Sequence, residues 1–161
     1  MNIGSEGNGK VGVETESGSC SDSIAGIVCN LLRNANVNTV LEVEPSRGSY
    51  TLKLAASCRQ LYCVDSSEDV LNGIQQAATK LHLNNIVTLK GKWEEWLPFP
   101  CDGVFAYNCF YQVDDLERCL MKIHESASEI CVIGVDDGSE MPYYRDFEQK
   151  LGFRVRETQL K

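Results

Sequence analysis

One short stretch constrains the fold of this chain more than any other: an apolar strand that runs into a tight turn and then into a helix. The strand at residues 40–43 is followed by Pro45, which has no backbone N–H and cannot extend a central strand ladder. Gly48 then precedes an apolar helical run over residues 50–56. A glycine beneath the start of a helix lets backbone and ligand approach closely, so this unit is typical of a nucleotide-type site.

Strand-like and helix-like segments alternate along the rest of the chain. Apolar residues at helical spacing predict helices over residues 22–32, 68–81, 116–123 and 143–151. Short apolar runs predict further strands at residues 60–65, 86–89 and 130–135, within 101–115, and from 153 to 158. Such alternation favours right-handed crossovers between parallel strands. We therefore predict a three-layer α/β/α sandwich with a Rossmann-like, mostly parallel sheet in strand order 3-2-1-4-5, followed by strand six.

The composition is that of one globular domain with a polar N-terminal segment. Of the 161 residues, 43% are hydrophobic, and no apolar run approaches the roughly 18 residues that cross a bilayer. Residues 1–20 hold almost no large apolar side chains, so we expect a flexible tail there and a folded domain over residues 21–161. The tail also lacks the apolar core of a signal peptide. We expect a cytoplasmic protein that does not contact membranes.

Charge and cysteine spacing argue against two functional classes. The net charge is −8 and no Lys/Arg cluster compensates it, which disfavours binding to nucleic acid. The eight cysteines form no CxxC pair, and both histidines lie far from any cysteine pair, so we expect no metal site. Cysteines in apolar segments, such as Cys63, Cys119 and Cys131, are expected to pack as small hydrophobic side chains in a reducing compartment.

The turn after the first strand resembles the first motif of class I S-adenosylmethionine-dependent methyltransferases, in which an acidic residue precedes alternating glycines. Glu42 holds the acidic position and Gly48 the last glycine, whereas Glu44 and Ser46 stand where the family has its two earlier glycines. The resemblance implies that these four residues line the site of the cofactor, S-adenosylmethionine. The glycine motif is thus degenerate.

The second strand ends in Asp65, 23 positions beyond the first acidic residue. In dinucleotide and S-adenosylmethionine folds, a carboxylate at this place accepts hydrogen bonds from ribose hydroxyls. The alternative is that Asp65 only caps the next helix. Ser66 with Asp69 matches the local capping signature better, which leaves Asp65 to face the strand ends. We therefore place both Asp65 and Ser66 in the cofactor site.

The third strand is followed by Gly91 and Lys92, where the family usually has glycine and aspartate. In the family that aspartate holds the adenine amino group, but a lysine has no acceptor. The acceptor here would be Glu94, a backbone carbonyl or water. Trp93, beside the glycine, is placed to touch a purine, although a tryptophan in this position more often packs in the core. The resemblance assigns Lys92 and Trp93 to the cofactor side.

Residues 101–115 resemble the fourth motif of the small-molecule methyltransferases: an aspartate before an apolar strand, an aromatic loop and an acidic helix start. This strand should lie beside the first, where strand order reverses and ligands bind. Asn108 would then face the cofactor; alternatively, it could belong to the N-P-P-Y element of nucleic-acid amino-methyltransferases, whose two prolines are absent. Tyr111 and Gln112 stand where relatives often carry histidines, so no catalytic base is identified.

Residues 147–153 resemble the late helix of the family and the Gly-Phe that begins strand six, after which no sequence remains for the seventh strand. The resemblance as a whole implies a methyltransferase acting on a small molecule. The alternatives are a catalytically inactive binding or regulatory module with a protein partner, and a different nucleotide-dependent enzyme. A charged sixth strand, with Arg154, Arg156, Glu157 and Lys161, predicts a monomer or weak dimer.

Overall fold

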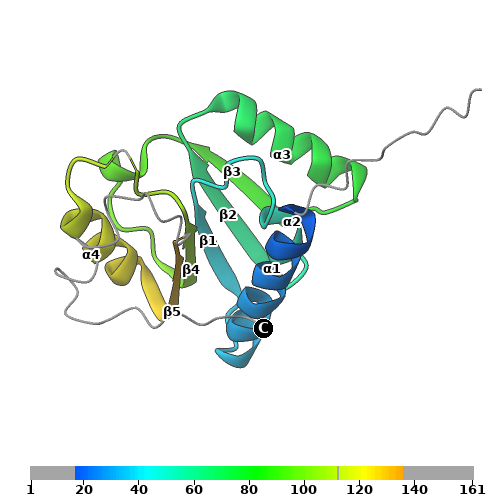
Figure 1. Cartoon of the computed structure of the whole chain (residues 1–161), viewed down its shortest axis with the longest axis horizontal. Coiled ribbons are helices and arrows are strands. Elements are labelled where there is room, and N and C mark those ends of the chain that lie inside the picture. The colour runs from blue at the N-terminus through cyan, green and yellow to red at the C-terminus, as the bar shows by residue number, and fades with distance from the viewer. Residues whose placement is uncertain (1–16, 112, 136–161) are drawn as a thin grey trace, which may run out of the picture.

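Five parallel strands form the central sheet of the protein, which a computed structural model describes over residues 17–111 and 113–135 (Figure 1). The strands are β1 (Thr39–Val43), β2 (Gln60–Asp65), β3 (Ile86–Lys90), β4 (Cys101–Tyr107) and β5 (Ala127–Gly134). The helices are α1 (Ser17–Asn34), α2 (Thr51–Ala55), α3 (Glu68–Lys80), the short 3-10 helix η1 (Trp93–Glu95) and α4 (Leu116–Ser126). The strand order is β3-β2-β1-β4-β5, as predicted for these five strands.

Helices cover both faces of the sheet and give it three layers. Helices α1, α2 and α3 pack on one face, and α4 packs on the other (Figure 1). Successive residues of β1 point to opposite faces, because side chains alternate along a strand. Val40 joins the core beneath α1 to α3, whereas Leu41 joins the core beneath α4. Burial on both faces explains the nearly continuous apolar character of β1 and β4.

The start of α3 corrects one prediction. Ser67, and not Ser66, is the N-cap, since its Oγ accepts a hydrogen bond from Val70 N at 3.4 Å. Asp65 Oδ1 accepts a second bond from Ser67 N at 2.8 Å. These two acceptors orient the chain between β2 and α3, and they keep Asp65 at the strand end.

The boundaries at the N-terminal side differ from the prediction by a few residues. Helix α1 already includes Ser17 and Ser19, which were assigned to the tail; residues 1–16 lie outside the described part of the chain. The predicted helix at 143–151, strand six and the question of a seventh strand fall in residues 136–161, which also lie outside it. Among the helices described, none combines the length and apolar character needed to cross a bilayer.

The seven cysteines whose side chains are described, from Cys29 to Cys131, are all unpaired. Cys63 and Cys119 are buried in the two cores, as predicted. Cys131, on β5, is exposed, so the prediction of a packed thiol is wrong there. No group of three or more metal-ligating side chains is found within residues 17–111 and 113–135.

Candidate functional site

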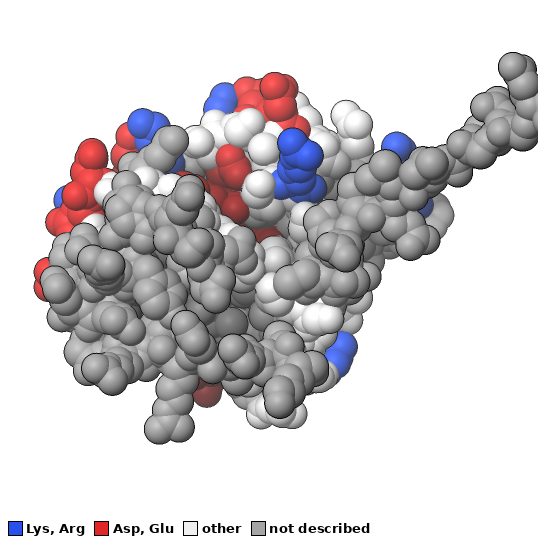
Figure 2. Space-filling model, viewed as in Figure 1, with Lys and Arg blue, Asp and Glu red and all other residues white. Residues whose placement is uncertain are grey.

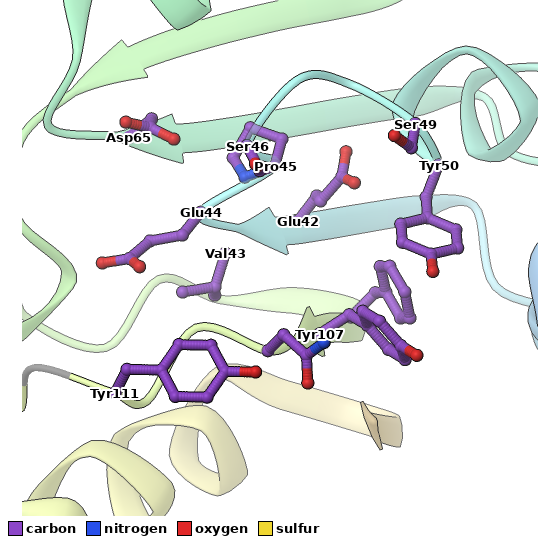
Figure 3. A pocket seen from close by; sticks show the side chains of 12 residues that line it. Glu42, Val43, Glu44, Pro45, Ser46, Ser49, Tyr50, Asp65, Tyr107 and Tyr111 are labelled. Atoms are coloured by element: carbon purple, nitrogen blue, oxygen red, sulfur yellow. The ribbon is translucent and has the colours of Figure 1, made fainter. Parts of the chain in front are cut away.

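Two cavities lie where β1, β2 and β4 end, and Figure 3 shows the larger one. The larger has a volume of about 730 Å³ and the smaller of about 280 Å³. Glu44, Asp65 and Tyr111 line both, so the two cavities adjoin. In open α/β sheets, ligands bind at the carboxyl ends of strands where the strand order reverses, and β1 lies between β2 and β4 at such a point. The larger volume is in the range of small-molecule sites.

Most of the residues predicted for the cofactor site line these cavities. Those in the larger cavity are Glu42, Glu44, Ser46, Asp65 and Asn108. The smaller cavity adds two more, Ser66 and Lys92. Gly48 and Trp93 line neither cavity.

The turn after β1 has the left-handed backbone conformation of a glycine motif, although Glu44 and Ser46 replace the first two glycines. Glu44 and Ser46 have φ angles of 51° and 54°, and Gly48 has a φ of 76°, so three alternating residues are left-handed. For residues with a Cβ this conformation costs about 1 to 2 kcal/mol each. Glu44 N donates to Val64 O at 2.8 Å, and Gly48 N donates to Pro45 O at 2.9 Å, which holds the turn in place.

Gly48 is required by packing as well as by its backbone angle. A Cβ at this position would lie 3.2 Å from Cγ1 of Ile74, a side chain of α3. The glycine therefore lets the turn sit close under α3. Its role is to support the site, and it does not contact the space that a ligand would occupy.

Glu42 places a carboxyl group in the interior beneath the turn. The side chain is 1% exposed, and Oε1 has no hydrogen-bond partner among the described residues; the same holds for the buried Thr51 Oγ1. Oε2 accepts a weak bond from the Cys63 thiol at 3.6 Å. Burial raises the pKa of Glu42 to about 7, and the nearby Thr51 hydroxyl and Cys63 thiol lower it only in part.

Glu44 extends from the end of β1 between the two cavities (Figure 3). The side chain is half-buried. Burial raises its pKa to about 7, and the negative charges of Glu94 and Asp65 add to this effect. A glycine here would leave this space open, so Glu44 changes both the shape and the charge of the site.

Asp65 lies at the end of β2 and is 7% exposed. Its Oδ1 is engaged by Ser67 N, and within the described part of the chain no hydrogen bond is formed by Oδ2. One oxygen thus orients α3, while the other is available on the cavity side. Asp65 can therefore act both as a local cap, through Oδ1, and as an acceptor in the cavity, through Oδ2.

Aromatic side chains form a wall of the larger cavity that sequence reasoning missed. Tyr50 contacts Phe105 and Tyr107, with ring centroids 5.3 and 5.0 Å apart. Phe105 and Tyr107 are two residues apart on β4 and thus point to the same face. This period-two spacing, next to the turn that carries Tyr50, was the signal available in the sequence.

Asn108 follows β4 in a left-handed conformation, with a φ of 52°. Asparagine tolerates this conformation better than most residues do. Its backbone N donates to Gly134 O at 3.0 Å, which anchors the end of β4 to β5. The described lining of the two cavities contains no histidine.

The segment after β3 separates Lys92 from Trp93. Lys92 lines the smaller cavity together with Glu94, which offers an acceptor that a lysine lacks. Trp93 is 2% exposed and packs in the core beneath α4, so the predicted contact with a purine is replaced by a packing role. Gly91 makes room for the indole of Trp96, since a Cβ there would clash with Trp96 Nε1.

The parallel sheet with a cavity at its switch point defines a Rossmann-like protein with a nucleotide-type site. A family model for the methyltransferase domain matches residues 41–128, more than half of the chain. The chain therefore belongs to the methyltransferase domain family, whose cofactor is S-adenosylmethionine. No curated protein matches the sequence.

Solved structures of methyltransferases share this fold. Magnesium protoporphyrin IX methyltransferase from Synechocystis PCC 6803, with bound SAH, superimposes with a TM-score of 0.64 at 16% identity, covering 79% of this chain and 61% of that one. A putative S-adenosylmethionine-dependent methyltransferase from Methanococcus maripaludis gives 0.61 at 16% identity, with coverage of 93% and 80%.

Coclaurine N-methyltransferase, bound to N-methylheliamine and SAH, gives a TM-score of 0.63 at 18% identity over 75% of this chain. This chain spans only 37% of that enzyme, and 46% of the YcgJ protein of Bacillus subtilis. It thus corresponds to only part of the length of these two proteins.

Proposed function

We propose that the protein binds S-adenosylmethionine in the larger cavity and transfers its methyl group to a small molecule. The observation that carries this proposal is the position of the cavity at the ends of β1, β2 and β4, with Asp65 on its wall. The family membership supports the cofactor, and the net charge of −8 disfavours a nucleic-acid substrate.

The residues present fit an adenosyl ligand. Asp65 Oδ2 would accept from ribose hydroxyls, as the acidic residue after the second strand does in nucleotide folds. Glu42 Oε1 and Thr51 Oγ1 lie near each other but form no hydrogen bond of good geometry among the described residues, so the Glu42 carboxyl group on the cavity wall could take a donor from a ligand. Glu94 supplies the acceptor for an amino group that Lys92 cannot provide.

Methyl transfer requires mainly that the protein hold the two reactants in the correct orientation. When bound, S-adenosylmethionine would supply a methyl group attached to a positively charged sulfur. Tyr50, Phe105 and Tyr107 would exclude water from one side, and the turn at 44–48 would fix the position of the ligand. Orientation of two reactants alone can supply a large part of a barrier reduction.

A second candidate function is a binding module without catalysis. The observation that favours it is Glu44, whose carboxylate occupies space that a glycine would leave open. Lys92 in place of an acidic residue points the same way. The two candidates share the ligand and differ in turnover. Release of S-adenosylhomocysteine from bound cofactor, in the presence of candidate acceptors, separates them.

Calorimetric titration with S-adenosylmethionine tests the proposed site through two neighbouring variants. Asp65→Ala removes the ribose acceptor and should weaken binding about ten- to a hundredfold, because charge-assisted bonds contribute about 1.5 to 3 kcal/mol. Ser67→Ala removes only the helix cap, so it should cost about 1 kcal/mol of stability and leave binding unchanged.

Asp65→Asn keeps an acceptor for Ser67 N and removes the charge, so it should fold normally and still bind weakly. If Asp65→Ala binds as tightly as the parent while unfolding earlier, Asp65 is only a local cap, and the proposal loses its best residue.

The proposal also includes the cellular compartment and the oligomeric state of the protein. The unpaired thiols of the seven described cysteines support a reducing compartment, the cytoplasm. The charged C-terminal segment supports a monomer or weak dimer, with a protein partner if the site is not catalytic. Light scattering at micromolar concentration tests the assembly, and a tight higher oligomer would contradict it.

A further inference from the structure

The charge of the larger cavity has one sign. Three carboxyl groups line it, those of Glu42, Glu44 and Asp65, and no lysine, arginine or histidine is among its described lining residues. In the adjoining smaller cavity, Lys92 is accompanied by Glu44, Asp65 and Glu94. On the surface around this end of the sheet, acidic and basic side chains are interspersed, so the sign of the charge is a property of the cavity lining (Figure 2). A ligand in this cavity therefore meets an excess of negative charge.

A second feature points to a ligand independently of this charge. The carboxyl group of Glu42 is 99% buried, lines the larger cavity, and leaves Oε1 without a partner in the described part of the chain. Buried polar atoms are rarely left unpaired in folded proteins. A hydrogen-bond donor or a cation in the cavity would satisfy this atom, whereas a ligand carboxylate would not.

Aromatic rings line the same cavity. Tyr50, Phe105 and Tyr107 form a contacting group, with centroids 5.0 to 6.3 Å apart, and Phe105 is the strand neighbour of Glu42. Aromatic rings attract cations, and this attraction grows when the cation is removed from water. Carboxyl groups and aromatic rings in one cavity form a combination that recognises positive charge.

We propose that this cavity selects its ligand by positive charge, and that it binds adenosyl sulfonium compounds without a carboxylate more tightly than S-adenosylmethionine itself. The inference rests on the proposed function, because it concerns the same site. Its order of affinity follows from ligand charge. Decarboxylated S-adenosylmethionine carries a sulfonium and an ammonium. S-adenosylmethionine adds a carboxylate, and S-adenosylhomocysteine has lost the sulfonium.

Helix α2 does not reverse this order. It has only five residues, and its first residue, Thr51, lies next to the buried Glu42. A helix of this length supplies little dipole to attract a carboxylate. The methionine carboxylate of the full cofactor would therefore lie near like charges, and the described lining of the larger cavity offers no basic side chain to pair with it.

Glu44 gives the proposal a second readout. The charged and titratable groups that face it come from β2, the η1 segment, the loop after β4 and α4. These groups are Asp65, Lys92, Glu94, Cys109, Tyr111 and Cys119. Burial and the charges of Glu94 and Asp65 raise the pKa of Glu44 to about 7, so part of the population is protonated at neutral pH. A cation beside Glu44 lowers that pKa and expels the proton.

The test is calorimetric titration of the full chain with decarboxylated S-adenosylmethionine, S-adenosylmethionine and S-adenosylhomocysteine, at pH 7 in buffers of different ionisation enthalpy. We expect affinity to fall by about tenfold at each step of the series, and proton release with the two sulfonium ligands. Glu44→Gln, which keeps the side-chain length, should compress the series severalfold and reduce the proton release to the share that comes from Glu42.

Glu117→Gln is the matched control, because it removes the same charge from an exposed position on α4 outside both cavities. It should leave the series unchanged. Equal affinities, or tightest binding of S-adenosylhomocysteine, overturn the charge inference and leave the methyltransferase proposal standing. Failure of all three ligands to bind overturns both.

Discussion

Two buried ionisable side chains of this protein, Lys122 and Glu42, differ in how well their polar atoms are hydrogen-bonded. Lys122, on α4, donates from Nζ to Trp93 O and to Glu94 O, both at 2.8 Å, and lies 5.3 Å from the centroid of the Trp93 ring. Glu42, on β1, is also buried, but the Cys63 thiol contacts Oε2 only weakly, the Thr51 hydroxyl lies nearby, and Oε1 forms no hydrogen bond among the described residues.

This difference indicates that Lys122 has a structural role and that Glu42 belongs to the ligand site. A buried amine with two carbonyl partners ties η1 to α4 and fixes the segment after β3, so its polar atoms are accounted for within the fold. A buried carboxyl group without partners costs stability by itself, about 1 to 3 kcal/mol for an unsatisfied group. Proteins retain such groups mainly where function requires them. We therefore expect the ligand on the Glu42 side of the sheet.

The largest expected effect concerns the framework. Lys122→Met should lower the free energy of unfolding by about 3 to 5 kcal/mol, because it removes two charge-assisted hydrogen bonds that contribute about 1.5 to 3 kcal/mol each. Urea unfolding measures the change. Arg118→Met, an exposed change on the same helix, should stay within about 0.5 kcal/mol of the parent. A change in the free energy of unfolding of less than about 1 kcal/mol for Lys122→Met would contradict the structural role that distinguishes Lys122 from Glu42.

A smaller effect concerns the pH dependence of stability. The folded-state pKa of Glu42 is raised from 4.5 to about 7, so the folded protein binds a proton there that the unfolded chain has released. Its stabilising contribution is therefore full below pH 4.5 and is lost as the pH rises through 7. We expect the free energy of unfolding to fall by up to about 3 kcal/mol between pH 5 and pH 8.

Glu42→Gln should flatten this profile and make the protein more stable than the parent at pH 8. Glu44, whose pKa is also raised to about 7, leaves a residual slope, reduced by its greater contact with solvent. Thermal unfolding across this pH range checks both variants. An unchanged slope in Glu42→Gln would show that the carboxyl group is not the buried, unpaired group described above.

The smallest effect concerns the turn itself. Ser46→Gly should stabilise the protein by about 1 kcal/mol, because glycine adopts the left-handed conformation at little cost. Ser49→Gly, three residues on and without a positive φ, should destabilise it by about 0.5 to 1 kcal/mol. Chemical denaturation of both variants distinguishes a conformational effect from a general effect of glycine. Destabilisation by Ser46→Gly would contradict the strain in this turn.

The sequence predicted the framework well because periodicity reports it directly. Alternating apolar segments gave the strand order, and Pro45 with Gly48 located the turn. The helix cap was misplaced by one residue, since Ser66 and Ser67 carry the same side chain and only backbone geometry tells them apart. That geometry is absent from a single sequence.

The site was predicted in part. Acidic residues at strand ends, such as Asp65, follow from the position of ligands in open sheets, but Trp93 could not be assigned to core or cavity by spacing alone. Three-dimensional burial decided it. The unpaired oxygen of Glu42 and the aromatic contact of Tyr50 depend on distances between β1, β4 and the turn, which no local pattern records.

Amide chemical shifts during titration with S-adenosylmethionine test the central claim most directly. The account predicts that shifts change in residues 42–50, around Asp65 and around Asn108, and that the amides of Trp93 and of α4 near Lys122 change little. Changes centred on Trp93 and Lys122, or none at the turn after β1 at saturating ligand, would contradict the assignment of the Glu42 side as the cofactor site.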